Sequence, residues 1–268
     1  KTLFAIQNLF TKFILTNIFS KFDTSKNIVH QFRAYFGKDF TKKIIPVSHH
    51  LSHVLSTLYF LEENENALAF SFDGSGDFST IEIYLLNGNK FKLLEKNNFP
   101  HSLGFYYMAF TQFLGFRKYG EEYKVMGMSG LGDPIYVDKI KKLIKSVYPF
   151  RLNLKYFNFP KISYHKHSPK VERLFNQKFI ELLGQPRTDN DDNIEKYYKD
   201  IAASMQKVFE DIALSYLKTY QKKFNSKKLF VTGGCAFNSL LIGKIIESKL
   251  FEKVSVGPNP GDAGGAIG

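Results

Sequence analysis

The stretch 67–77, ALAFSFDGSGD, is the part of the chain from which the fold can be worked outward. Six mostly apolar residues followed by a polar, glycine-rich segment predict a buried strand that ends in a turn. The next stretch, 78–85, alternates like a half-buried strand, and the Asn-Gly-Asn at 87–89 marks a second hairpin. We therefore expect an antiparallel meander over 67–96.

Two histidines at helical spacing precede this strand. The segment 49–61, HHLSHVLSTLYFL, predicts a helix on which His49 and His53 leave the same face, one turn apart. Two helical ligands of a divalent metal ion have this spacing, although a pair of surface or capping histidines would have it too. His50 stands where a zinc protease carries Glu, which argues against a metalloprotease. We expect His50 to lie behind the ligands or at the surface.

The polar segment after the strand could complete a site for a metal ion and a phosphate. Asp73, at the mouth of the strand, could supply an oxygen ligand to a metal ion. The glycines that follow, Gly74 and Gly76, would let backbone N–H groups turn toward a phosphate. A metal ion beside a phosphate indicates phosphoryl or acyl-phosphate chemistry rather than a structural zinc.

Composition narrows the class of protein. With 268 residues and 44% hydrophobic content the chain can form a well-buried core. Its net charge of +12 comes from 32 Lys and only 5 Arg. Because specific recognition of nucleic acids relies mostly on arginine, the charge indicates attraction to anionic substrates and argues against nucleic acid as a partner.

Cysteine usage and the first apolar run bear on the compartment. The single cysteine, Cys235, excludes a disulfide framework and fits a reducing compartment. The apolar opening, 3–19, is interrupted by Gln, Asn and Lys, so it predicts an amphipathic helix rather than a signal peptide or a membrane span. We expect a cytoplasmic protein without a membrane partner.

The pattern of apolar and polar residues predicts further helices and strands. Helices are expected at 3–20, 27–36, 102–116 with Ser102 as cap, 135–147, 193–224 and after Asn238, and strands at 43–47, 228–232 and 253–256. The segment 120–132 is expected to be a loop that brings Glu122 and Lys124 together among glycines.

A second glycine-rich junction follows strand 228–232. The sequence GGCAFN at 233–238 places two glycines between a strand and a helix N-terminus, where an anion or nucleotide can approach the backbone. We expect Cys235 to be a small residue packed beneath this loop rather than a nucleophile. The rigid turn 257–262, GPNPGD, leads to Asp262, expected as the N-cap of a helix.

Taken in order, these motifs resemble the NodU/CmcH family of O-carbamoyltransferases, whose catalytic domain is similar to the Kae1 protein. The matching stretches are HHLSH (49–53), FDGSGD (72–77), SLGFYYMAFTQFLGF (102–116), GEEYKVMGMSGLGD (120–133), IAASMQKVFE (201–210), TGGCAFNS (232–239) and VGPNPGDAGGAIG (256–268). The resemblance implies an α/β fold of the actin/Hsp70-type ATPase class (RNase H-like, Kae1-like) with two lobes, incomplete at both ends. Residues 1–66 would be a remnant of the first lobe and 67–268 the second.

The resemblance also implies a reaction. In such enzymes a YrdC-like domain of the same full-length chain makes carbamoyl-adenylate from carbamoyl phosphate and ATP, and the Kae1-like domain moves the carbamoyl group to a hydroxyl of a small-molecule or carbohydrate acceptor. The family's metal ligands fall on His49, His53, Asp73 and Asp262. Such mixed ligation suits iron, zinc or manganese alike.

Other roles follow from the chemistry that the resemblance implies. The backbones of Gly74, Ser75, Gly76, Gly233 and Gly234, with Asn238 as a further polar contact, would bind the nucleotide. Lys124 would balance charge on the phosphate or acyl oxygen, and Glu122 would orient Lys124. The acceptor and the base that deprotonates it are not assigned.

The chain departs from the family pattern at both ends. The family's N-terminal phosphate hairpin and its C-terminal YrdC-like domain have no counterpart here, so we expect this chain alone not to perform the overall reaction. Two other functions stay open. One is a tRNA threonylcarbamoyl transferase of the Kae1/TsaD type, and the other is a non-enzymatic nucleotide-binding regulatory module.

Overall fold

The structure, a computed structural model, describes residues 31–38, 45, 47–57, 66–88, 90–118, 120–159, 173–188 and 194–268. Contacts divide the chain into two units, Lys1–Val47 and Ser48–Gly268. In the first unit residues 31–36 are helical, within the predicted helix 27–36. The predicted helix 3–20 lies outside the described residues. Of the predicted strand 43–47 only residues 45 and 47 are described, and neither is in regular structure.

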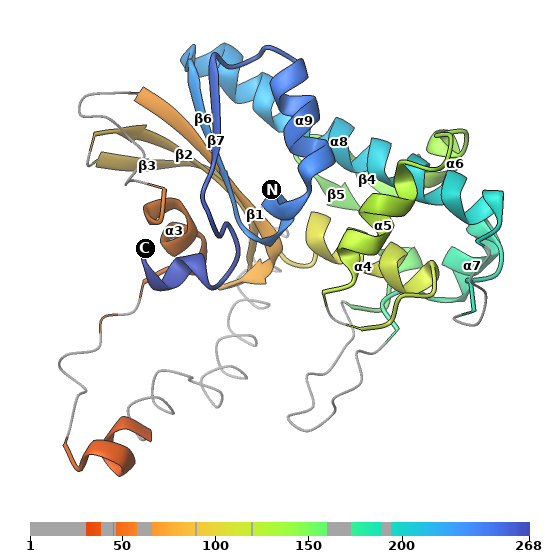
Figure 1. The fold of residues 1–268 in the computed structure, drawn as a ribbon, viewed down its shortest axis with the longest axis horizontal. Coiled ribbons are helices and arrows are strands. Elements are labelled where there is room, and N and C mark those ends of the chain that lie inside the picture. The colour runs from red at the N-terminus through yellow and green to blue at the C-terminus, as the bar shows by residue number, and fades with distance from the viewer. Residues whose placement is uncertain are drawn as a thin grey trace, which may run out of the picture. The chain divides into compact units, whose positions relative to one another are not determined.

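The second unit is built on a five-stranded sheet with the order β3-β2-β1-β6-β7 (Figure 1). Its strands are β1 (Asn66–Gly76), β2 (Ser79–Asn87), β3 (Lys90–Asn98), β6 (Lys228–Thr232) and β7 (Lys253–Val256). The first three strands pair antiparallel, whereas β6 pairs parallel with both β1 and β7. The predicted meander and the two later strands are therefore confirmed.

Helices cover both faces of this sheet. The helical elements are α3 (His49–Leu55), α4 (Leu103–Phe113), α5 (Glu122–Ser129), α6 (Val137–Lys141), α7 (Gln177–Leu183), α8 (Lys196–Phe224), α9 (Ser239–Glu247) and the 3-10 turns η3 (Leu154–Tyr156), η5 (Gly234–Phe237) and η6 (Gly264–Ala266). A separate two-stranded sheet consists of β4 (Ile144–Ser146) and β5 (Arg151–Leu152). Among the described residues, no helix is both long and apolar enough to cross a membrane.

The alternation of side chains along β1 explains why an apolar cluster lies on each face of the sheet. Leu68, Phe70 and Phe72 lie in the large core together with residues of α4 and α8, whereas Ala67 and Ala69 lie in a small cluster with Val54 of α3. Successive residues of a strand point to opposite faces, so one strand supplies both cores. The small alanine side chains leave room for α3 to pack closely on the sheet.

This packing bears on the predicted division of the chain at residue 66. Helix α3 contacts β1, β2 and β6, and contacts place the division between Val47 and Ser48. The division into two lobes at residue 66 stays a prediction, whereas helix α3 itself groups with the sheet. The reason is the apolar cluster between α3 and β1, which local sequence pattern does not reveal.

Three local predictions were wrong. The segment 120–132 was expected as a loop, but α5 forms there because its buried side of Val125 and Met128 packs in the large core, which outweighs the low helix propensity of its glycine. The helix expected at 135–147 ends at Lys141, since β4 instead pairs with β5. Asp262 does not cap an α-helix, because the small residues after it form only the 3-10 turn η6.

Candidate metal centre

The structure brings together the four side chains that the sequence singled out as metal ligands. His49 and His53 come from α3, Asp73 from β1, and Asp262 from the turn after β7, and one ligand atom of each lies within 4.8 Å of the others. The two Nε2 atoms are 3.1 Å apart. The distances from Nε2 to the carboxylate oxygens are 3.5 Å (His49–Asp73), 3.6 Å (His49–Asp262), 3.2 Å (His53–Asp73) and 3.5 Å (His53–Asp262).

These separations fit a single bound ion. Ligand bonds of about 2.1 Å at tetrahedral angles put ligand atoms about 3.4 Å apart. Two imidazole nitrogens and two carboxylate oxygens form a donor set that suits iron, zinc or manganese. The spacing and chemistry of the donors therefore fit the divalent ion that the resemblance implies, without selecting one metal.

Helix α3 is tied to the sheet by three polar contacts. The backbone N–H of His49 donates to Oδ2 of Asp77 over 2.8 Å, and the hydroxyl of Thr232 donates to the carbonyl of His53 over 3.1 Å. His50 lies behind the ligand pair and is fully buried, with Nδ1 2.7 Å from the hydroxyl of Ser71. Of the two positions expected for His50, behind the ligands or at the surface, the structure therefore shows the one behind the ligands.

The electrostatics of Asp73 favour a ligand carboxylate. Burial opposes its ionisation, but hydrogen bonds from His49, His53 and the backbone N–H groups of Gly234 (3.0 Å) and Gly74 (2.6 Å) outweigh burial and hold the pKa of Asp73 well below its usual range. Asp73 is therefore ionised, which is the form that binds a metal ion. The hydrogen bond to Asp73 in turn raises the pKa of His49, so protons compete with a metal ion there.

The glycines expected to bind a nucleotide differ in what surrounds them. A Cβ on Gly76 would lie 2.0 Å from the ring of His49, and one on Gly234 would lie 2.9 Å from Oδ1 of Asp73. Gly233 has a φ of 90° and abuts the carbonyl of Phe72. A Cβ on Gly74 would have no atom within 4 Å. Internal packing thus explains three of these glycines, and Gly74 keeps the open space that an approaching ligand needs.

The other nucleotide-binding candidates are Ser75 and Asn238, which differ in exposure. Ser75 is exposed on β1. Asn238 is buried and caps α9: its Oδ1 accepts from the N–H of Leu241 and from Nε2 of Gln206, each over 2.9 Å, and its Nδ2 donates to Oε1 of Gln206. The side chain of Asn238 is thus largely occupied by the protein itself. Burial raises the pKa of the Cys235 thiol, in keeping with a packed residue.

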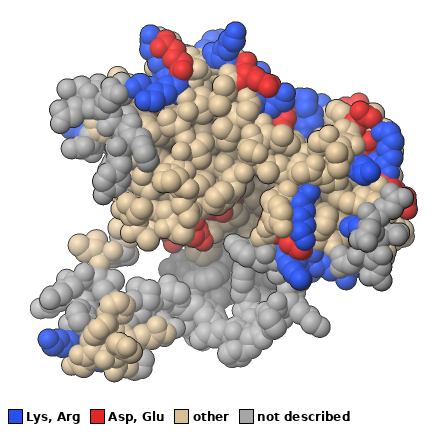
Figure 2. Space-filling view, in the orientation of Figure 1, with Lys and Arg blue, Asp and Glu red and all other residues tan. Residues whose placement is uncertain are grey.

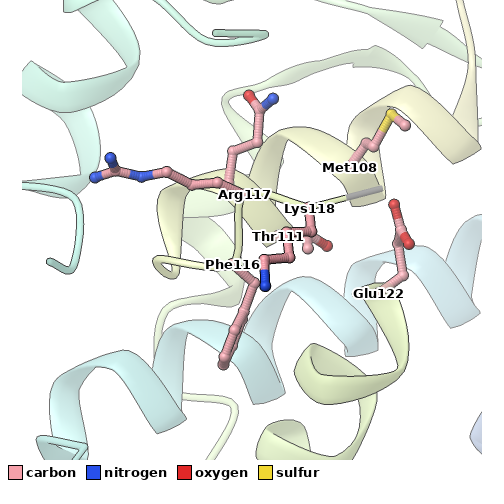
Figure 3. A pocket seen from close by; sticks show the side chains of 7 residues that line it. Met108, Thr111, Phe116, Arg117, Lys118 and Glu122 are labelled. Atoms are coloured by element: carbon pink, nitrogen blue, oxygen red, sulfur yellow. The ribbon is translucent and has the colours of Figure 1, made fainter. Parts of the chain in front are cut away.

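The two catalytic candidates, Glu122 and Lys124, both lie in the first turn of α5 but do not pair with each other. Lys124 pairs with Glu121, over 2.6 Å, and not with Glu122. Glu122 instead points into a hollow at the C-terminal half of α4 (Figure 3). Burial raises the pKa of Glu122, and neighbouring Glu121 adds to the shift. The hollow is lined by Glu122 together with Met108, Thr111, Gln112, Phe116, Arg117 and Lys118.

The sequence analysis missed two residues that hold the ligands. Asp77 lies in the quoted segment FDGSGD, four residues after Asp73, but its contact with the backbone of His49 has no sequence signature. Thr232 immediately precedes the glycine pair at 233–234 and contacts the carbonyl of His53. Both residues stand beside a motif that the sequence analysis singled out. Each of them, however, contacts a histidine backbone that lies far away in the sequence.

Comparisons with known proteins place the chain in a family. A family model described as "Carbamoyltransferase N-terminus" matches residues 2–268. The nodulation protein NolNO of Sinorhizobium fredii is 30% identical over 88% of this chain and 33% of its own length. The nodulation protein NolO of Bradyrhizobium diazoefficiens is 29% identical over 83% of this chain and 37% of its own length. The chain thus spans about a third of these relatives.

Two solved structures are also similar. HypF of T. kodakarensis has a TM-score of 0.42 and 14% identity, covering 90% of this chain and 37% of its own. A full-length HypF in the phosphate- and nucleotide-bound form has a TM-score of 0.42 and 15% identity, covering 85% and 43%. From the match to the family model over residues 2–268, the chain belongs to the carbamoyltransferase family, which confirms its resemblance to the NodU/CmcH proteins.

Proposed function

We propose that this chain is the part of an O-carbamoyltransferase that moves the carbamoyl group from carbamoyl-adenylate, made from carbamoyl phosphate and ATP, to a hydroxyl of a small-molecule or sugar acceptor. The observation that carries the proposal is the convergence of His49, His53, Asp73 and Asp262 in a member of this family. The similarity to the nodulation proteins NolNO and NolO further supports it.

The fold supports a finer assignment, which we also propose. Three antiparallel strands followed by two parallel ones, in the order β3-β2-β1-β6-β7, are what we expect of the second lobe of an actin/Hsp70-type, Kae1-like domain. Asp73 and the glycine pair at 233–234 follow the paired ends of β1 and β6, where ligands bind in many α/β folds. The single cysteine and the use of ATP favour a cytoplasmic location.

The four ligands would hold one divalent ion, which supplies Lewis-acid stabilisation of charge on the phosphate and acyl oxygens. The open face of Gly74 would admit the adenylate phosphate beside Asp73. In the transfer, the bond between the carbamoyl carbon and the phosphate oxygen breaks, AMP leaves, and the acceptor oxygen bonds to that carbon.

The acceptor hydroxyl loses its proton in this step, and we assign that proton to Glu122. Its carboxylate lines the hollow beside α4, and burial raises its pKa, which makes it a stronger proton acceptor than an exposed carboxylate. The first turn of α4 lies against the ligand segment: a Cβ on Gly104 would lie 2.6 Å from the backbone nitrogen of Gly74. Met108 of the hollow is one helical turn further on, about 6 Å along the helix axis. Lys124, paired with Glu121, remains the candidate for balancing charge.

The charge distribution favours this function over the transfer of threonylcarbamoyl to tRNA. On the face shown in Figure 2, Lys and Arg lie along the upper and right-hand margins and also further in on the right, in several places beside Asp and Glu, instead of gathering in one stripe. A protein that follows a nucleic-acid backbone carries its basic residues as a patch or stripe. The family membership favours the carbamoyltransferase as well.

The proposal is tested by following the carbamoyl group. The chain is combined with a carbamoyl-adenylate-forming domain, ATP and ¹⁴C-labelled carbamoyl phosphate, and label is measured in a panel of sugar and polyol acceptors. We expect label in an acceptor with the parent chain and none with His53→Ala. Metal-loaded, folded parent that labels no acceptor, but modifies tRNA when given threonylcarbamoyl-adenylate, would support the tRNA function instead.

A further inference from the structure

The tip of the β1–β2 hairpin has an unusual backbone. Asp77 and Phe78 form a two-residue turn, closed by the pairing of Gly76 with Ser79, and their φ values are 49° and 64°. Two-residue hairpins favour turns with positive φ at both positions, usually occupied by Asn or Asp and then Gly. A bulky residue such as Phe78 is disfavoured in this conformation. Contacts made by the turn must therefore stabilise it.

One such contact reaches the candidate metal centre. Oδ2 of Asp77 accepts the backbone N–H of His49, the first residue of α3, over 2.8 Å. Ser48, which precedes the helix, makes no side-chain capping hydrogen bond. Asp77 thus provides, from another element, the acceptor that a helix N-terminus needs, and its negative charge complements the helix dipole there.

The same segment also fixes the ring of His49. The ring occupies the space above Gly76, where a Cβ would lie 2.0 Å from Cδ2. Residues 73–77 therefore contain a ligand, Asp73, a contact surface for the imidazole, Gly76, and an anchor for the backbone, Asp77. All three contact or approach His49, whose Nε2 lies 3.5 Å from Oδ2 of Asp73.

We propose that Asp77 is a positioning residue for the metal centre: its carboxylate holds the start of α3 so that His49 stays at ligand distance from Asp73. Asp77 belongs to neither the set of four ligands nor the hollow beside Glu122. The inference rests on the proposed function, because it assigns Asp77 a role at the metal site that the proposed function requires.

Three variants of the turn separate this role from the stability of the turn. Asp77→Gly keeps a residue that readily adopts positive φ but removes the carboxylate. Asp77→Asn keeps positive φ and an acceptor oxygen but removes the charge. Phe78→Gly, the matched control, relieves the neighbouring backbone and leaves Asp77 in place.

The affinity of the whole chain for Zn²⁺ is measured by competition with a chromophoric chelator, together with the visible spectrum of the Co²⁺ complex and hydrogen exchange of the His49 amide. We expect Asp77→Gly to weaken Zn²⁺ binding about 10-fold or more, as loss of a residue that orients a ligand does, and to alter the Co²⁺ bands. Exchange of the His49 amide should accelerate by a similar factor. Asp77→Asn should stay within about 3-fold of the parent, because an uncharged acceptor still holds the amide, and Phe78→Gly should match the parent.

The outcomes distinguish the two proposals. If the parent and Asp77→Gly bind Zn²⁺ equally well with the same Co²⁺ spectrum, the positioning role is wrong and the metal site stands. If Asp77→Asn or Phe78→Gly lowers the affinity as much as Asp77→Gly does, the hydrogen bond to His49 is not the cause and the positioning role is likewise wrong. If the folded parent binds no metal ion, the metal site is wrong and the positioning role falls with it.

Discussion

The N–H of Gly234 donates to Oδ2 of Asp73 over 3.0 Å, although the two residues are 161 positions apart in the chain. Parallel pairing of β1 with β6, in which Ser71 lies opposite Thr232, brings the ends of the two strands together and makes this contact possible. Asp73 is thereby both a metal-ligand candidate and the link between the two glycine-rich segments. The site thus depends on the sheet more than on either motif.

Two alanine substitutions in the β1 segment should affect different properties of the protein. Gly76→Ala would place a methyl group 2.0 Å from the ring of His49, so we expect weaker metal binding and a less stable fold. Gly74→Ala meets no atom within 4 Å, so we expect a change in unfolding free energy within about 0.5 kcal/mol but weaker ATP binding. Urea unfolding and calorimetric titration with ATP measure these effects. Equal metal affinity of Gly76→Ala and the parent would contradict the packing argument.

The amide of Asn238 should contribute more to stability than to nucleotide binding. Asn238→Ala removes the α9 cap and the pair with Gln206, and we expect a loss of about 1–3 kcal/mol in unfolding free energy. A double-mutant cycle with Gln206→Ala checks the coupling, which we expect to exceed 0.5 kcal/mol, the usual order for contacting residues. A fall in ATP affinity that is specific to Asn238→Ala, with little loss of stability, would show that the side chain instead binds the nucleotide.

The carboxyl of Glu122 should govern the acid side of the pH–rate profile. A base acts in its deprotonated form, so carbamoyl transfer should rise as the pH increases through the raised pKa of Glu122. Glu122→Gln should lower the rate by about 10²- to 10⁴-fold and abolish this limb. Glu181→Gln, on the exposed side of α7, is the matched control and should keep the parent profile. A normal acid limb in Glu122→Gln would exclude Glu122 as the base.

His101 should make the fold less stable in mild acid. Burial, with the nearby charges of Arg151 and Lys145, lowers the pKa of His101 from 6.5 to about 4, and its Nδ1 accepts the N–H of Leu152 over 3.1 Å. Because the unfolded chain binds the proton first, this contribution to stability is complete above pH 6.5 and is lost as the pH falls toward 4. The loss is at most about 3 kcal/mol.

The matched variant for this effect is His101→Asn, which keeps an acceptor for Leu152 but does not titrate. Unfolding free energies from urea titrations at several pH values between 4 and 7 should fall more steeply for the parent than for the variant. Parallel curves for the two proteins would mean that His101 titrates normally in the folded state.

Strands and long helices could be predicted because their signals are local. The apolar run of β1 and the bounds of β6 and β7 follow from period and from flanking turn residues, and Ser102 caps α4 through its hydroxyl as expected. Helix α5 could not be predicted, because its glycine weakens the local signal and its stability comes from contacts with α8. Tertiary packing decides such segments.

The candidate site was predictable only as a set of residues. The spacing of His49 and His53 showed that they share a face, and the place of Asp73 at the mouth of a strand offered a third ligand. The family resemblance added Asp262, but the distances among the four depend on the sheet. The role of Gly76 illustrates the limit. A glycine before Asp77 could equally serve a phosphate or an imidazole, and only the fold shows that the ring of His49 fills the space.

The metal content of the chain tests the central claim most directly. The parent, the double variant His49→Ala/His53→Ala and the control His101→Asn are each loaded with Fe²⁺, Zn²⁺ or Mn²⁺, dialysed, and analysed by mass spectrometry, with circular dichroism to establish folding. We predict about one equivalent of metal in the parent and in His101→Asn, and none in the double variant. A folded parent that retains no metal, or a double variant that retains as much as the parent, would contradict the account.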